Sequence, residues 1–246
     1  MKRLLSLLLA LSLLLAGNAV ALGLAALLEQ GGLQPSPEPG RLAGIIIGID
    51  PGHQAKGNPE KEAVAPGSSE MKAKVSSGTA GVRTRIPEYQ TNLEISLMLR
   101  DALEALGCTV YMTRETNDVD ISNQERAIMM NELGADLVLR LHCDGNNDPS
   151  VHGAAMYVRK TGAMAEESAA AAEILLECMT EVTGARARGV FKRDTYTMNN
   201  WSEVPCILVE MGFMSNPEED EKLNDASYQA LIVQGLVDGI CRWSGR

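Results

Sequence analysis

The chain has 246 residues with a formal charge of −10, and 45% of its residues are hydrophobic but only 4% aromatic. This content suffices for a buried core, whereas the acidic balance and the lack of a Lys/Arg cluster argue against nucleic-acid binding. The few aromatic residues argue against a stacking platform or an aromatic-lined sugar groove, and five cysteines are too few for a disulfide scaffold, so we expect buried free thiols.

The N-terminal segment has the form of an export signal. Lys2 and Arg3 precede an uncharged run over residues 4–28, and Ala19-Val20-Ala21 fits a small-residue cleavage site. At 1.5 Å per residue such a run spans roughly 37 Å, more than the ~30 Å hydrocarbon core of a bilayer. Cleavage near Ala21 and retention as a signal-anchor therefore both stay open, and a buried core helix is a third, less common alternative. Both membrane readings place the rest of the chain outside the cytoplasm.

A short spacer separates this leader from the folded part. Residues 29–40 combine three Pro and three Gly without apolar periodicity, which is typical of a flexible linker. We therefore divide the chain into a leader over 1–28, a linker over 29–40 and one catalytic domain over 41–246.

Strands and helices alternate along the expected domain. Apolar runs predict strands at residues 45–50, 108–113, 136–142, 152–159 and 205–210. Helical spacing predicts helices at residues 91–106, 122–134, 163–184 and 227–243, the second with a Ser122/Glu125 capping box. The long polar stretch over 54–87 is predicted to be a functional or substrate-covering loop. The alternation predicts a single α/β domain whose mainly parallel central sheet has helices on both faces.

Reactive residue types occur where such a sheet places its sites, at the carboxyl ends of strands. His53 follows the first strand and His142 ends the third, so two imidazoles can converge on one point, and catalytic zinc often binds two His and a carboxylate. Glu88 lies at the start of a helix, where the helix dipole favours a carboxylate. Its position can therefore be explained without a ligand role. Glu210 ends an apolar run; lost hydration would raise its pKa toward that of a general base, although a helix cap or a paired core acid is the alternative.

Four segments, in order, resemble those of the zinc-dependent N-acetylmuramoyl-L-alanine amidases of bacterial cell-wall metabolism: IIIGIDPGH, EYQTNLEISLMLRDAL, NQERAIMMNELGADLVLRLHCD and VPCILVEMGFMSNPEE. The resemblance covers about residues 44–243. It implies that His53, Glu88 and His142 are zinc ligands and that Glu210 is the catalytic carboxylate.

The resemblance also implies the reaction and the partners. The substrate would be peptidoglycan, cut at the amide between N-acetylmuramic acid and L-alanine, with the carbonyl polarised by Zn²⁺ and the water activated by Zn²⁺ and Glu210. We expect a monomer with no nucleic-acid partner, located outside the cell or in its wall, or tethered to the membrane through residues 4–28 and facing the wall.

Some positions depart from the family or stay without a role. Gln54-Ala55-Lys56-Gly57 stands where glycines are common, and Cys143 stands where a small residue is usual, for which we expect a packing role. Arg126, Asn131 and Asn216 are structural or substrate-orienting, with neither role assigned.

Three alternatives remain. A phosphate-binding ATPase would need a second phosphate turn, which we do not find. A non-catalytic wall-binding or regulatory module with the amidase fold is the second, and another zinc amide hydrolase, such as a carboxypeptidase, is the third.

Overall fold

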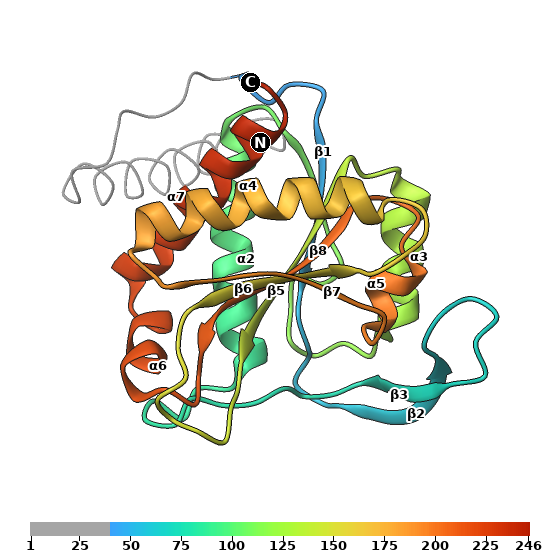
Figure 1. Cartoon of the computed structure of the whole chain (residues 1–246), viewed down its shortest axis with the longest axis horizontal. Coiled ribbons are helices and arrows are strands. Elements are labelled where there is room, and N and C mark those ends of the chain that lie inside the picture. Colours follow the sequence, from blue (N-terminus) through green and yellow to red (C-terminus); the bar gives the residue numbers. More distant parts are fainter. Residues whose placement is uncertain (1–39) are drawn as a thin grey trace, which may run out of the picture. The chain divides into compact units, whose positions relative to one another are not determined.

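A six-stranded sheet forms the centre of the computed structural model, which describes residues 40–246 (Figure 1). The expected leader, its cleavage site, the membrane tether and nearly all of the linker lie outside the described residues. The strands follow the order β4-β1-β5-β8-β6-β7, and only the β8/β6 pair is antiparallel. Their bounds are β1 (Ile46–Pro51), β4 (Thr109–Met112), β5 (Leu137–Asp144), β6 (Ala154–Arg159), β7 (Ala187–Arg193) and β8 (Cys206–Phe213). The predicted mainly parallel sheet is confirmed.

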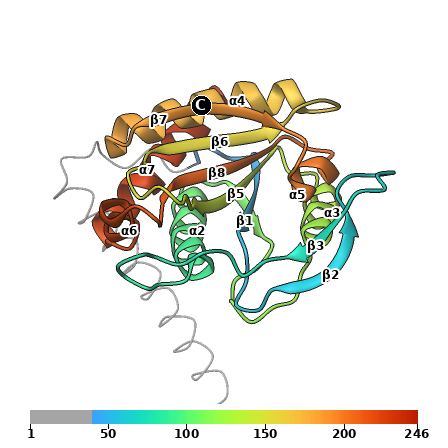
Figure 2. The same cartoon turned by 60° about the horizontal axis from the view of Figure 1, so that its bottom comes forward.

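Helices cover both faces of this sheet (Figure 2). One face carries the larger hydrophobic cluster, to which α2 (Glu88–Ala105), α4 (Ala165–Thr183) and α7 (Ala226–Trp243) contribute. The opposite face carries a smaller cluster with residues of α3 (Asn123–Leu133) and α5 (Thr197–Trp201). A further short helix, α6 (Pro217–Leu223), follows β8. The predicted α/β architecture is confirmed, including the helices on both faces.

The alternation of the strands decides which face carries the polar residues. Successive strand residues point to opposite faces, and Ile49, Leu141 and Val209 belong to the larger cluster. Their neighbours in sequence, Asp50, Arg140, His142 and Glu210, therefore point to the face of α3 and α5 and are all buried. The chemistry-bearing residues are thus gathered on one side of the sheet.

The ends of α3 form as the sequence predicts. The Ser122 hydroxyl accepts a hydrogen bond from the Glu125 N–H, and the Glu125 carboxylate accepts one from the Ser122 N–H, which completes the capping box. Gly134 ends the helix with φ of 60°, in the left-handed region that favours glycine. The first predicted helix begins earlier than its apolar spacing indicates, because it starts at Glu88 directly after Pro87.

The main difference from prediction is a hairpin in the stretch expected to be a loop. Residues 54–87 contain β2 (Asn58–Ala63) paired antiparallel with β3 (Met71–Val75). Hydrogen bonds connect this polar hairpin to the start of α3. Glu62 accepts a hydrogen bond from the Gln124 N–H, and the Asn123 amide donates one to the Lys74 carbonyl. The hairpin therefore does not need an apolar face of alternating residues, which is the pattern that would have predicted it. Also unpredicted were β7, a charged strand at the sheet edge, and the short helices α5 and α6.

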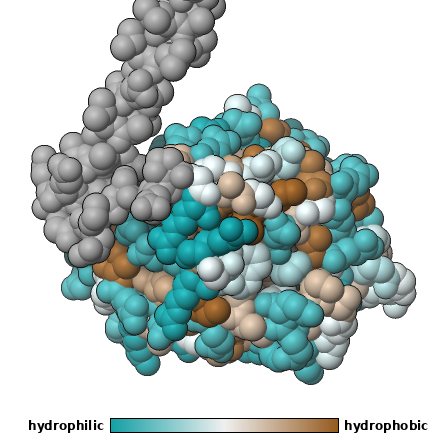
Figure 3. Space-filling view, turned by 90° about the horizontal axis from the view of Figure 1, so that it is seen from above, coloured by the Kyte–Doolittle hydropathy of each residue, from teal (hydrophilic) through white to brown (hydrophobic). Residues whose placement is uncertain are grey.

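The described surface mixes hydrophilic and hydrophobic residues, as Figure 3 shows for one face. Among the helices of residues 40–246, none is both long and apolar enough to span a bilayer. All five cysteines are buried and unpaired, as expected from their contexts.

Candidate metal centre

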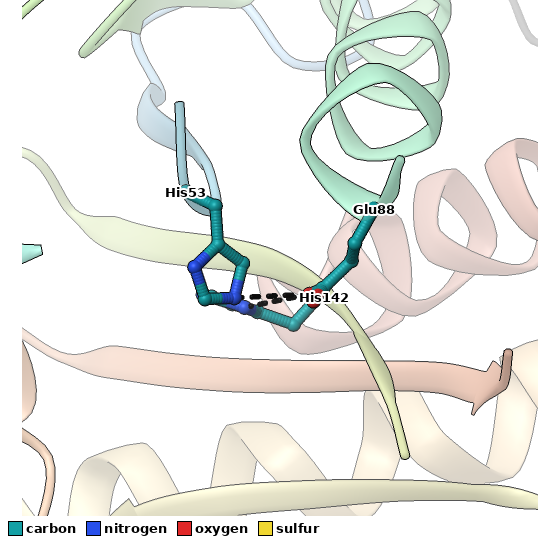
Figure 4. Close-up of side chains that lie close together, drawn as sticks. All are labelled: His53, Glu88 and His142. Atoms are coloured by element: carbon teal, nitrogen blue, oxygen red, sulfur yellow. Dashed lines mark hydrogen bonds and ion pairs between the residues drawn. The ribbon is translucent and has the colours of Figure 1, made fainter. Parts of the chain in front are cut away.

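Three side chains from separate elements point at one another near the carboxyl edge of the sheet (Figure 4). His53 follows β1, Glu88 begins α2 and His142 lies in β5. His53 Nε2 and His142 Nδ1 each lie 3.2 Å from Glu88 Oε1, and the two rings are nearly perpendicular with centroids 4.7 Å apart. One ligand atom from each residue lies within 4.8 Å of the others. The three residues predicted to be ligands are therefore brought together.

His53 is held in a conformation that few non-glycine residues adopt. Its φ of 62° lies in the left-handed region, which is sterically unfavourable for a residue with a Cβ. The ring is oriented by Ser76, whose carbonyl oxygen lies 2.9 Å and whose hydroxyl 3.0 Å from Nδ1. The backbone is fixed by Arg126, which donates to the His53 carbonyl at 3.1 Å. Such strain concentrates where a side chain must be aimed at a site, and here it turns Nε2 toward Glu88.

Glu88 is buried and remains ionised. Its Oε2 accepts a hydrogen bond from the Thr79 N–H at 3.0 Å, and its Oε1 accepts from the Cys143 N–H at 3.1 Å and the Asn92 amide at 3.2 Å. Burial raises the pKa of Glu88, but the hydrogen bonds and the electrostatic attraction of the His142 and His53 rings outweigh it and hold the pKa well below its ordinary value. A fixed anionic oxygen is thus presented between the two imidazoles.

His142 is packed on the backbone of Gly52. A Cβ at Gly52 would overlap the imidazole ring, so glycine is required there. Burial lowers the pKa of His142 to about 4, which leaves the ring neutral at pH 7. Its Nε2 is buried without a hydrogen-bond partner among the described residues.

This donor set fits a divalent transition metal. Neutral imidazole and carboxylate are ligands that zinc uses in catalytic sites, commonly as two His and one Glu with a further position open. His142 Nε2 has no hydrogen-bond partner among the described residues, so this ring nitrogen is free to bind a ligand. The second ring nitrogen of His53, Nδ1, contacts the Ser76 carbonyl oxygen, and contacts of this kind orient imidazoles that bind a metal.

Glu210 lies beside this cluster on the neighbouring strand. It pairs in register with His142 across β5 and β8, and its Oε2 is buried without a partner among the described residues. Burial, followed by the negative charges of Glu88 and Asp144, raises the pKa of Glu210 well above its ordinary value, while Arg140 opposes the shift. Within residues 40–246 no cation is hydrogen-bonded to Glu210, so these surroundings do not support the alternative of a paired core acid.

An open depression gives access to these groups. It has a volume of about 630 Å³ and is lined by His53, Glu88 and Glu210 together with Ser215, the loop at 78–79, and the end of β5 with the loop that follows it, residues 143–147. A substrate can therefore reach His53, Glu88 and Glu210 from the same side.

A buried ion-pair network lies behind the candidate metal centre. Asp50 accepts hydrogen bonds from Arg126 at 2.7 Å, from Arg140 at 3.1 Å and from the Thr113 hydroxyl at 2.6 Å. Although burial raises the pKa of Asp50, the two guanidinium groups reverse the shift and hold it far below its ordinary value. Arg126 also donates to the Pro51 and His53 carbonyls. This network fixes the turn that carries His53, so Arg126 has a structural, positioning role.

The residues that the sequence left without a role are structural as well. Asn131 bonds to the Trp201 carbonyl and the Glu203 N–H, and Asn216 caps α6. Gln54 is fully buried and bonds to Arg126 and the Ile121 N–H. The Cys143 thiol is buried, and burial raises its pKa well above its ordinary value, which agrees with a packing role.

Several residues that build the site were not predicted. Ser76 and Thr79 come from the stretch without periodicity, so no sequence signal pointed to them. Asn92 could have been found, because it lies four residues after Glu88 on the same face of the helix. Arg114 donates to the Pro51 and Gly52 carbonyls and so supports the same turn as Arg126.

Comparison with known proteins identifies a family and several relatives that this chain resembles. Residues 47–242 match the family described as N-acetylmuramoyl-L-alanine amidase. The chain is 29% identical over 198 residues to the amidase LytC of Bacillus subtilis, 28% over 217 residues to the amidase Rv3717 of Mycobacterium tuberculosis, and 27% over 199 residues to the probable cell wall amidase LytH of Staphylococcus aureus. These matches cover 80%, 83% and 81% of this chain, but 35%, 88% and 58% of the relatives. The chain thus spans about a third of LytC and just over half of LytH.

Solved structures share the fold. The amidase Ami1 of Mycobacterium smegmatis superposes with a TM-score of 0.76 at 24% identity, covering 83% of this chain and 98% of that one. An amidase of Clostridium difficile superposes with a TM-score of 0.69 at 24% identity, covering 83% and 98%.

Proposed function

The chain belongs to the N-acetylmuramoyl-L-alanine amidase family, and from that premise we propose that it is a zinc-dependent hydrolase of the amide between N-acetylmuramic acid and L-alanine in peptidoglycan. His53, Glu88 and His142 would hold the metal, and Glu210 would be the catalytic base. The observation that carries the proposal is the convergence of two imidazoles and an ionised carboxylate next to a buried, unpartnered carboxyl group.

Zinc would supply a Lewis acid that polarises the scissile carbonyl and a positive charge that lowers the pKa of an attacking water and of Glu210. The chain's own residues account for the remaining steps. Glu210 takes a proton from the water as it attacks and returns it to the departing amine of L-alanine, since one carboxylate can serve in both steps. Burial and the negative charges of Glu88 and Asp144 favour the protonated form that returns the proton, whereas the positive charge of the metal would favour the ionised form that takes it.

The surroundings of the site support these roles. Ser76 fixes the His53 ring and the Asn92 amide fixes Glu88, so both side chains are preorganised. The depression of about 630 Å³ opens onto His53, Glu88 and Glu210 together. A non-catalytic wall-binding module would not need a partnerless buried carboxyl group, which is unfavourable unless it serves chemistry.

Metal content and hydrolysis, measured on the same preparations of the full chain, test the proposal. Glu210→Ala should retain zinc yet lose hydrolysis of purified cell walls, whereas His53→Ala should lose both. Glu94→Ala is the matched control, since Glu94 is exposed on α2 and bonds only to Gln90 among the described residues. If Glu210→Ala cleaved walls at near the wild-type rate, the assignment of the base would be wrong.

A chelator separates the remaining alternatives. We expect a zone of clearing on a peptidoglycan zymogram that disappears with chelator and returns with added zinc. A wall-binding module would bind walls without clearing them, and a carboxypeptidase would release residues from the end of the stem peptide.

The cellular location of the enzyme forms part of the same proposal. We propose that residues 1–28 direct export, that residues 29–40 act as a linker and that residues 41–246 work as a monomer on the wall. The domain would be released outside the cell or stay tethered through residues 4–28. Western blotting of membrane and medium fractions tests this: release predicts a shortened chain in the medium, and tethering predicts the full chain in the membrane.

A further inference from the structure

The chain is poor in aromatic residues, yet three of them cluster on β6, β7 and the segment before α5. The rings of Tyr157 and Phe191, which pair in register across β6 and β7, have centroids 5.3 Å apart and planes 28° apart. Tyr196 packs on Tyr157 with centroids 5.4 Å apart. The Arg193 guanidinium lies 5.5 Å from the centre of the Phe191 ring. We call Tyr157, Phe191, Tyr196 and Arg193 the aromatic patch.

The aromatic patch lies on the same face of the sheet as Glu210. Ala155 pairs with Glu210 on one side and with Gly189 on the other, and Tyr157 and Phe191 lie two residues further along their strands. Burial, followed by the negative charge of Glu210, raises the pKa of the Tyr196 phenol, which agrees with the placement that the strand register gives.

The surface between Glu210 and the aromatic patch is open at Gly189. Ala155, which pairs with both Glu210 and Gly189, is fully buried, whereas Gly189 is partly exposed and a Cβ there would meet no atom within 4 Å. The hairpin borders the patch, because the Lys72 ammonium donates to the carbonyl of Thr195, next to Tyr196, at 2.7 Å. An extended substrate bound at Glu210 can therefore continue past Gly189 to the rings.

The chemistry of the aromatic patch matches a sugar ring. The three rings are half-buried, so they are ordered by packing yet keep exposed surface. The Tyr157 and Tyr196 hydroxyls make no hydrogen bond within residues 40–246, and Arg193 is exposed with unused donors. A pyranose offers an apolar C–H face to an aromatic ring and hydroxyl or acetamido groups to neighbouring donors. A stem peptide would pair a carboxylate with Arg193, but its polar backbone offers no apolar face to match the three rings.

We propose that the aromatic patch binds a sugar of the glycan strand beyond the N-acetylmuramic acid whose amide is cut. This inference rests on the proposed function and deepens it, because it makes the enzyme selective for polymeric glycan over a single muramoyl peptide. The low aromatic content of the whole chain argued against an aromatic-lined sugar groove. Three of the few aromatic rings nevertheless lie side by side in the aromatic patch.

The test compares two substrates that carry the same tripeptide: a single N-acetylmuramoyl tripeptide, and a tetrasaccharide of alternating N-acetylglucosamine and N-acetylmuramoyl tripeptide. In the full chain, Phe191→Leu keeps an apolar side chain but removes the ring. We expect kcat/KM on the tetrasaccharide to fall about tenfold, as expected for losing an anchoring aromatic contact. On the single-sugar substrate we expect the same rate as wild type, and Phe191→Tyr should retain both rates.

Two further variants keep the test decisive. Tyr196→Leu removes a second ring from a different segment and should show the same selective loss if Phe191→Leu does not fold. Tyr111→Leu is the control, since Tyr111 is an exposed aromatic residue on β4 at the opposite edge of the sheet and should change neither rate. Equal losses on both substrates, or no loss on either, would overturn the sugar assignment. If wild type cuts neither substrate, the proposed function itself fails and this inference with it.

Discussion

Asp50 and Glu210 are two buried acids near the carboxyl ends of β1 and β8, on the same face of the sheet and separated by β5. Asp50 is surrounded by Arg126, Arg140 and the Thr113 hydroxyl, and its pKa is far below the ordinary value. Glu210 has an oxygen without a partner and faces the charges of Glu88 and Asp144, so its pKa is raised. The same chemical group thus holds a turn in one place, and under the proposed function it moves a proton in the other.

The largest effect should come from Glu210→Gln, which tests whether the partnerless acid is kept for chemistry. The amide cannot exchange a proton, so hydrolysis of purified peptidoglycan should fall by about 10²–10⁴-fold, the usual contribution of a general base. The free energy of unfolding should change little, because the amide has nearly the shape of the protonated acid. If Glu210→Gln were fully active, Glu210 would not serve the chemistry. If Glu210→Gln unfolded, Glu210 would stabilise the fold as Asp50 does.

Asp50→Asn should have the opposite signature, a large loss of stability. It leaves two guanidinium groups buried without a countercharge, and breaking a buried pair in this way costs about 3–5 kcal/mol. Urea unfolding, monitored by circular dichroism, measures the loss against wild type. Activity should fall only as far as the turn at Pro51 to His53 is displaced. A loss of stability below about 1 kcal/mol would contradict the anchoring role of Asp50.

The pH dependence of stability should separate the two acids further, measured on the metal-free full chain. The folded-state pKa of Asp50 is lowered, so its contribution is present above the unfolded pKa of about 3.9 and is lost as the pH falls below it. The stability gap between wild type and Asp50→Asn should therefore narrow by up to about 1.4 kcal/mol per pH unit in acid.

For Glu210 the sign is reversed. Its folded-state pKa is raised, so its contribution is complete below the unfolded pKa of about 4.3 and is lost as the pH rises through the folded-state value. Wild type should lose stability relative to Glu210→Gln over that range. The difference in free energy of unfolding between wild type and Asp50→Asn and that between wild type and Glu210→Gln should thus change in opposite directions with pH. If both differences changed in the same direction, the surroundings of the two acids would not differ as described.

The smallest effect is expected for an exposed ion pair, which sharpens the contrast with the buried one. Arg83 contacts Glu221 at 2.8 Å, but both side chains are more than half exposed. Solvent screens such pairs, so Arg83→Ala should leave the urea midpoint within error of wild type. A midpoint lowered as far as that of Asp50→Asn would mean that burial does not decide the strength of these pairs.

The sequence predicts the elements that depend on hydrophobic pattern and caps. Ile46 to Ile49, Leu137 to Leu139 and Ile207 to Val209 are continuous apolar runs, which is how strands buried on both faces appear. Their ends place His53, His142 and Glu210 at one edge of the sheet. Ser122 and Gly134 mark the ends of α3 to the residue.

Other parts depend on contacts between distant segments and leave no local pattern. The hairpin is attached by Glu62 and Lys74 to the start of α3, some 50 to 60 residues later. Ser76 and Thr79 reach His53 and Glu88 through backbone groups, which any residue type carries. Tyr157 and Phe191 meet through the register of two strands, so composition alone argued against the patch that they form.

Under the proposed function, this site cuts one particular bond with the help of a metal. Mass analysis of the products that the full chain releases from a defined peptidoglycan, with zinc and with a chelator, tests it most directly. We predict that a free amino group appears on L-alanine, that the chelator abolishes the cleavage and that added zinc restores it. Cleavage elsewhere in the stem peptide, or undiminished cleavage with the chelator, would contradict the claim.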